Sequence, residues 1–106
     1  MVSFNDFKRI DLRIARIISA EPHPSADRLY VLKIDVGDEQ KQLVAGLKGH
    51  YEPDELKDKY IVVVNNLQPA SLRGVESQGM LLAAQDGEKV VLISPEEPVS
   101  PGSEIL

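Results

Sequence analysis

The 106-residue sequence contains no cysteine and no tryptophan. The lack of cysteine excludes disulfide bonds, thiolate nucleophiles and cysteine-based zinc sites, and it suits a reducing compartment. No apolar run approaches the roughly 18 residues that a membrane-spanning helix needs, and the first residues lack the apolar stretch of a secretory signal. We therefore expect a folded cytoplasmic protein with no membrane contact.

Side chains for catalysis or metal binding are also scarce. Of the two histidines, His23 lies between prolines and His50 lies in a Gly-His-Tyr segment, and neither belongs to a recognisable triad motif. A structural or solvent-exposed role is the expectation for each. The glycines form no phosphate-binding loop, and no His or carboxylate cluster has metal-ligand spacing. The sequence favours a protein that is not an enzyme and that uses no cofactor or metal.

A net charge of -5 does not suggest a nucleic-acid binder, but the charge is unevenly distributed. Residues 1–50 hold eight Lys or Arg against seven Asp or Glu, whereas residues 51–106 hold four against ten. A ligand feels mainly the charges within a Debye length of about 8 to 10 Å. A local basic patch therefore remains compatible with the composition.

Alternating apolar and polar residues predict an all-β fold. In the clearest strand, residues 29–37, Tyr30, Leu32 and Ile34 share one face and Lys33 lies on the other. Alternation fails at 16–18, as in a bulged or strongly curved strand. Short strands with little helix predict a five-stranded Greek-key barrel of the oligonucleotide/oligosaccharide-binding (OB) type. The expected strands lie at 11–21, 29–37, 42–47, 60–67, 79–84 and 89–95, with helical turns near 3–10 and 53–59.

The chain is expected to form one domain, residues 1–106, with a helical element at 1–10, a barrel at 11–94 and a C-terminal extension at 95–106. Apolar residues at both ends exceed what a small barrel needs. Two arrangements fit them equally well, a homodimer interface and packing back onto their own barrel. These residues are Phe4, Phe7, Ile10, Ile105 and Leu106.

The segment LRGVESQGMLLAA, residues 72–84, has two readings. Gly74 and Gly79 could simply permit turns while Met80 fills a gap in the core. Alternatively, Ser77 beside Gly79 suits close approach by a phosphate or ribose. The basic residues on and beside the strands are equally ambiguous, because they could line one barrel face or simply be solvated; they are Arg28, Lys33, Lys41 and Lys48.

Four segments together resemble a tRNA-binding domain family built on an OB barrel: HPSADRLYVLKIDVG (23–37), LVAGL (43–47), VVVNNLQPASLRGVESQGMLLAA (62–84) and VSPGSEI (99–105). Within that family the chain looks most like the C-terminal domain, or separate β subunit, of methionyl-tRNA synthetase. The resemblance implies a homodimer that binds tRNA by shape and backbone, without chemistry, and assists the catalytic part of that synthetase. The low aromatic content, 5%, agrees with recognition that does not depend on base stacking.

The resemblance also assigns the RNA-binding residues. They are expected to be Arg28, Lys33, Lys41, Asn66, Arg73, Ser77 and Met80. We expect direct contacts from Arg73 and Ser77, and a loop-shaping role for Met80. Many relatives carry basic residues where this chain reads QPAS at 68–71, which predicts weak, auxiliary binding. Two other functions remain open, a chaperone-like peptide-binding dimer of the same fold and a module that only dimerises its parent enzyme.

Overall fold

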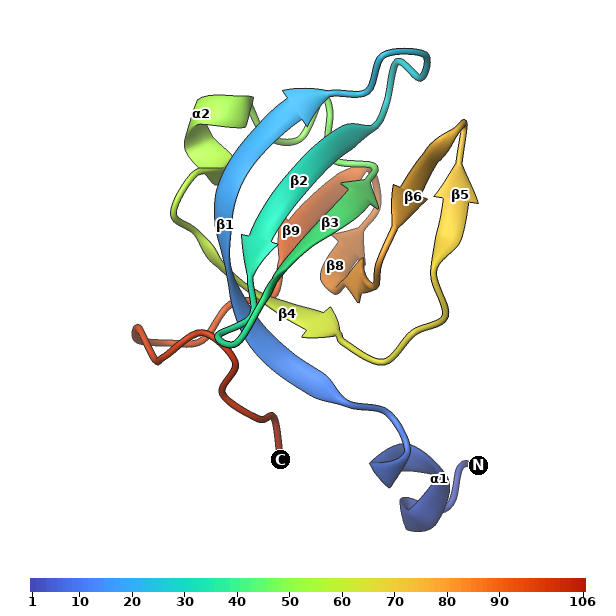
Figure 1. Ribbon diagram of the computed structural model, residues 1–106, viewed down its shortest axis with the longest axis vertical. Helices are drawn as coiled ribbons and strands as arrows, with labels where there is room; N and C mark the ends of the chain where they lie inside the picture. Colours follow the sequence, from blue (N-terminus) through green and yellow to red (C-terminus); the bar gives the residue numbers. More distant parts are fainter.

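Five strands form one antiparallel sheet that curls into a nearly closed barrel (Figure 1). The computed structural model describes residues 1–106. The strand order is β3-β2-β1-β4-β7, so β1 lies at the centre of the sheet. The all-β barrel expected from the sequence is confirmed. The bounds of these strands are β1 Leu12–Pro22, β2 Tyr30–Asp35, β3 Gln40–Ala45, β4 Tyr60–Val64 and β7 Met80–Leu81.

The long strand β1 supplies the curvature that closes the barrel. Its register against β2 shifts between Ile17 and Ser19, which is the irregularity that the broken alternation predicted. The alternation of β2 is also confirmed, because Tyr30, Leu32 and Ile34 are buried while Lys33 is exposed. One face of this sheet therefore forms the core and the other is available to ligands.

The core is a cluster of 13 buried residues drawn mainly from β1 to β4. The short helix α2, Pro53–Leu56, covers one end of it with the fully buried Leu56, and Pro53 begins the helix as expected. Burying one leucine in this way stabilises a fold by roughly 1.5–3 kcal/mol. Neither helix is long and apolar enough to cross a membrane.

Two hairpins complete the fold: β5 Ala70–Leu72 with β6 Val75–Ser77, and β8 Ala83–Asp86 with β9 Lys89–Leu92. The β5–β6 hairpin was not predicted from the sequence, because its strands have only three residues each and are mostly exposed. Its turn residues Arg73 and Gly74 have φ values of 54° and 89°. A type I′ turn requires two positive φ values, but arginine is a weak signal for one. The predicted strand ends also differ by a few residues; for example, β4 ends at Val64 instead of residue 67.

One side-chain and one backbone hydrogen bond close the gap between β3 and the segment that joins β6 to β7. The backbone N–H of Gln42 donates to Gln78 Oε1 at 2.9 Å, and Gln78 N–H donates to the Gln42 carbonyl at 2.8 Å. On the other side, Gly79 allows the segment to lie close to β4, because a Cβ at that position would lie 2.8 Å from the carbonyl oxygen of Val64. The motif around residue 79 is therefore part of the barrel wall.

Both chain termini lie at the same end of the barrel (Figure 1). Helix α1, Phe4–Lys8, follows the N-cap residue Ser3, whose hydroxyl accepts the Asp6 N–H at 3.1 Å. The C-terminal segment runs beside the start of β1, where Ile105 N–H donates to the Leu12 carbonyl at 2.9 Å. This arrangement places the two apolar ends of the chain next to each other.

Candidate nucleic-acid interface

The β1–β2 loop and the β5–β6 hairpin touch at the end of the barrel remote from α1 (Figure 1). His23 Nε2 lies 2.9 Å from the Leu72 carbonyl, and Ser25 Oγ donates to the Arg73 carbonyl at 3.2 Å. In return, Arg73 Nη2 donates to the Ser25 carbonyl at 3.3 Å. The loop that carries Arg28 and the turn that carries Arg73 are thus held together.

Lys33 is connected to the same hairpin through β3. Its Nζ donates to Gln42 Oε1 at 3.1 Å, and Gln42 Nε2 donates to the Glu76 carbonyl on β6 at 2.9 Å. Arg28, Lys33 and Arg73 are all exposed, and none of them forms an ion pair with an acidic side chain. We call these three residues the cationic face. Their charges can meet phosphates without first breaking a salt bridge.

The exposures of Ser77 and Met80 are the reverse of those expected for a direct RNA contact and a loop-shaping residue. Ser77 is only 4% exposed, and its Oγ accepts the Val44 N–H at 3.0 Å while donating to the Gly79 carbonyl at 2.9 Å. This hydroxyl therefore joins β3 to β6 and is not available for direct contact with RNA. Met80 is 54% exposed on β7, where a ligand can reach it.

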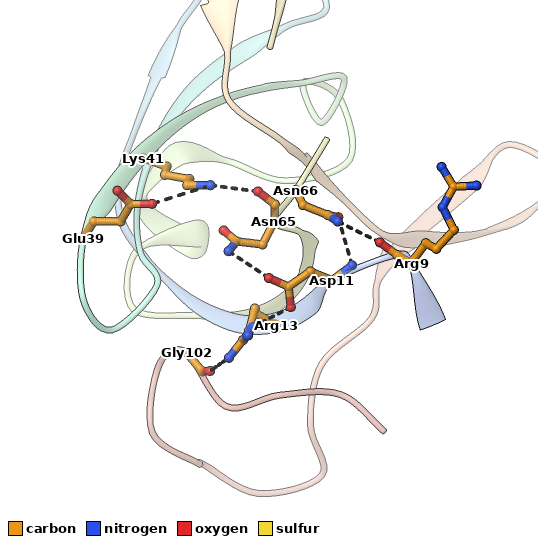
Figure 2. Close-up of polar contacts among 8 residues, drawn as sticks. All are labelled: Arg9, Asp11, Arg13, Glu39, Lys41, Asn65, Asn66 and Gly102. Atoms are coloured by element: carbon orange, nitrogen blue, oxygen red, sulfur yellow. Dashed lines mark hydrogen bonds and ion pairs between the residues drawn. The ribbon is translucent and has the colours of Figure 1, made fainter. Parts of the chain in front are cut away.

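The other two predicted RNA-binding residues belong to a hydrogen-bond network around Asp11 (Figure 2). Lys41 Nζ donates to the Asn65 carbonyl at 2.8 Å, and the Lys41 side chain is 17% exposed. Asn66 accepts the Asp11 N–H at 2.9 Å and donates to the Arg9 carbonyl at 2.7 Å. Both side chains are thus engaged in holding the end of β4 to its neighbours, and the structure does not join them to the cationic face.

Asp11 is the acidic centre of that network. Its carboxylate accepts from Arg13 Nε at 2.6 Å and from Asn65 Nδ2 at 3.3 Å. The hydrogen bond from Arg13 is the main cause of a lowered Asp11 pKa; burial opposes it, and the Asn65 bond adds to it. A carboxyl group with a lowered pKa stabilises the fold at neutral pH, and this stabilisation is lost as the pH falls through its titration.

The apolar residues predicted at a dimer interface line one groove of about 240 Å³ between α1 and the C-terminal segment. Helix α1 has no buried residue, and Phe4 and Phe7 are 71% and 46% exposed. Packing back onto the barrel is therefore not the arrangement of these two side chains. We call this surface the apolar groove; its apolar residues are Phe4, Phe7, Ile10, Leu12, Ile105 and Leu106.

Several residues at the site had no functional signal in the sequence. His23 is buried and joins two segments, whereas His50 is exposed. Gln42 and Gln78 link β3 to the hairpin, but an isolated glutamine in a strand carries no recognisable pattern. No group of three or more His, Cys, Asp or Glu side chains is arranged to hold a metal ion.

Comparison with known proteins gives consistent matches. The model of a family described as "Putative tRNA binding domain" matches residues 12–104. The methionine–tRNA ligase of Thermococcus kodakarensis is 58% identical over 104 residues, which are 98% of this chain and 14% of that protein. The chain thus spans about a seventh of the length of the curated relatives it matches first.

Solved structures agree with the sequence matches. A MetRS-related protein from Pyrococcus horikoshii has a TM-score of 0.93 and 32% identity, covering 100% of this chain and 98% of that chain. The chaperone CsaA from Bacillus anthracis also has a TM-score of 0.93 and 32% identity, covering 100% and 99%. The same fold therefore occurs in a structure described as a MetRS-related protein and in one described as a chaperone.

Proposed function

The chain belongs to the tRNA-binding domain family, and from that premise we propose that it binds tRNA mainly through Arg28, Lys33 and Arg73. The single observation that carries this assignment is the hydrogen-bonded connection between the β1–β2 loop, the β5–β6 hairpin and β2, which gathers three cations free of ion pairs. Met80 adds an exposed contact, while Ser77 shapes the surface from below. Lys41 and Asn66 support the fold next to it.

Phosphate contacts are the physical basis of this binding. Each cation that neutralises a phosphate releases about one counterion, so a few contacts give modest, salt-dependent affinity. The net charge of -5 opposes the approach of a polyanion. We therefore expect auxiliary binding that recognises the shape and backbone of folded RNA, not a base sequence.

The biological role proposed for the domain is to help methionyl-tRNA synthetase hold its substrate. Support comes from relatives named methionine–tRNA ligase, which match almost all of this chain. The proposed partner is the catalytic part of that enzyme, and the domain itself supplies no catalytic residue. Its proposed place of action is the cytoplasm.

A titration of labelled tRNA at several salt concentrations tests the proposed function. Binding is expected at low salt. The logarithm of the association constant should fall linearly with the logarithm of the salt concentration, with a slope of roughly -2 to -3 for three phosphate contacts. Heparin serves as a polyanion without RNA shape. An absence of binding at low salt, or equal affinity for heparin, would contradict the proposal.

Homodimerisation through the apolar groove is the second part of the proposal. The wild-type protein is expected to sediment as a dimer, and Phe7→Asp is expected to sediment as a monomer that remains folded, because Phe7 is outside the core. Val99→Asp changes an exposed apolar residue outside the groove and is the matched control. A dimer that persists in Phe7→Asp would assign the interface elsewhere.

A chaperone-like function is the second candidate, favoured by the fold shared with the CsaA chaperone structure. It predicts that the protein suppresses aggregation of an unfolded substrate protein and binds tRNA no better than heparin. A dimerisation-only module predicts a dimer with neither property. An aggregation-suppression assay beside the tRNA titration separates the three functions.

A further inference from the structure

His23 is one of two buried polar side chains, and it lies where the β1–β2 loop leaves β1. It is 6% exposed, and its backbone N–H donates to the Leu29 carbonyl at 2.9 Å, which closes the base of the loop. His23 is not among the residues proposed to contact tRNA. A buried imidazole between two segments that carry candidate RNA contacts needs a physical explanation.

The hydrogen bonds of the ring define its tautomer. Nδ1 lies 3.0 Å from the Ser25 backbone nitrogen, whose N–H donates to it, so Nδ1 must keep its lone pair. The ring proton is therefore on Nε2, which donates to the Leu72 carbonyl at 2.9 Å. One nitrogen of the ring thus holds the loop, and the other holds the hairpin.

The hairpin depends on such contacts for its position. All residues of β5 are exposed, and Arg73 has a φ of 54°, in the left-handed region that disfavours arginine. Isolated two-stranded hairpins are marginally stable in water. Bonds from His23 and Ser25 to the carbonyls of Leu72 and Arg73 fix the last residue of β5 and the first residue of the turn.

We propose that His23 is a positioning residue for tRNA binding, whose Nε2–H joins the β5–β6 hairpin to the β1–β2 loop so that Arg73 and Arg28 meet the phosphates as one preordered unit. The inference rests on the proposed function. Groups held in place before binding lose less conformational entropy when a ligand arrives. His23 touches no phosphate itself and acts through Arg73.

Two substitutions of His23 test the hydrogen bonds of its two ring nitrogens separately. In His23→Gln, the side-chain Nε2–H₂ can donate to the Leu72 carbonyl but nothing replaces Nδ1. In His23→Asn, Oδ1 takes the place of Nδ1 and accepts from Ser25, but the side chain is too short to reach Leu72. Both residues are neutral and polar, so the pair differs mainly in which bond survives.

Titration of labelled tRNA against the full chain is the measurement. His23→Asn is expected to weaken binding by about threefold to tenfold, the range of one hydrogen bond, while His23→Gln stays close to wild type. In an Arg73→Ala background, His23→Asn should weaken binding much less, because the residue acts through Arg73. Circular dichroism and sedimentation should show that all variants keep their fold and association state.

Three outcomes would overturn the inference. Unchanged tRNA affinity in His23→Asn would mean that binding does not need the bond from His23 to the Leu72 carbonyl. Equal losses in both variants, or a loss of the same size with and without Arg73, would reduce His23 to a general structural residue. If the wild-type chain binds no tRNA, the proposed function itself has failed. In that case, faster amide exchange in the hairpin of His23→Asn than in that of His23→Gln would show that the His23–Leu72 bond is structural only.

Discussion

At the scale of single residues, the structure divides the predicted RNA-binding set by what each side chain already contacts. Lys33 could be assigned to the outer face from the alternation of its strand alone. Ser77 could not be assigned, because its hydroxyl pairs with the Val44 amide 33 positions away, and such a partner is invisible in sequence. Residues at the surface of a strand were predictable, and those engaged in distant hydrogen bonds were not.

Lys33→Ala tests whether the exposed face of β2 contacts phosphate. Affinity for tRNA is expected to fall. The slope of log affinity against log salt concentration should decrease in magnitude by about one, because one phosphate contact is lost. The unfolding free energy should change by less than about 0.5 kcal/mol, because Lys33 is exposed. Titration and urea unfolding measure the two effects.

Lys57→Ala is the matched control for this substitution. Lys57 is an exposed lysine at the end of α2, across the barrel from the β5–β6 hairpin (Figure 1). The same loss of charge there should leave tRNA affinity nearly unchanged. Equal effects of the two substitutions would mean that only net charge matters and that no local site exists at Lys33.

Asn66→Ala should lower stability without a specific effect on RNA. It removes the bonds to the Asp11 amide and the Arg9 carbonyl, which should cost about 1–2 kcal/mol of unfolding free energy. The dimer should also weaken, because those bonds orient the segment that leads from α1. Gln68→Ala, an exposed amide that forms no side-chain hydrogen bond, is the control. Reduced tRNA affinity at unchanged stability would instead indicate that the Asn66 side chain contacts RNA directly.

At the scale of elements, the β5–β6 hairpin is where sequence prediction failed and where the candidate site lies. The long strands have alternating side chains because each buries one face, so their pattern is readable. The hairpin buries little surface, because every residue of β5 is exposed and only Ser77 of β6 is buried. Bonds to the β1–β2 loop and to β3 hold it in place. Elements that depend on tertiary contacts leave little local signal.

Arg73→Asn separates the stability of this hairpin from its function. Asparagine tolerates positive φ better than arginine, so the unfolding free energy should stay equal or rise by up to roughly 1 kcal/mol. Affinity for tRNA should fall, because the guanidinium is lost. Arg73→Lys keeps the charge and should retain most of the affinity; a loss equal to that of Arg73→Asn would show that charge at this position is not the contact.

At the scale of the whole molecule, the two candidate surfaces lie at opposite ends of the barrel. The β1–β2 loop and β5–β6 hairpin occupy one end, and α1 and the C-terminus occupy the other (Figure 1). A dimer formed through the apolar groove would leave the cationic face of each protomer free. Two such faces in one assembly would raise the effective concentration of contacts for a single RNA.

Mapping backbone amides of the ¹⁵N-labelled protein during titration with unlabelled tRNA tests the location of the interface most directly. The largest changes in chemical shift are expected at residues 25–28, 33, 42 and 72–80, which belong to the β1–β2 loop, the exposed side of β2 and β3, and the β5–β6 hairpin with the start of β7. Changes concentrated on α2 and the β8–β9 hairpin, with the loop and the β5–β6 hairpin unaffected, would contradict the account.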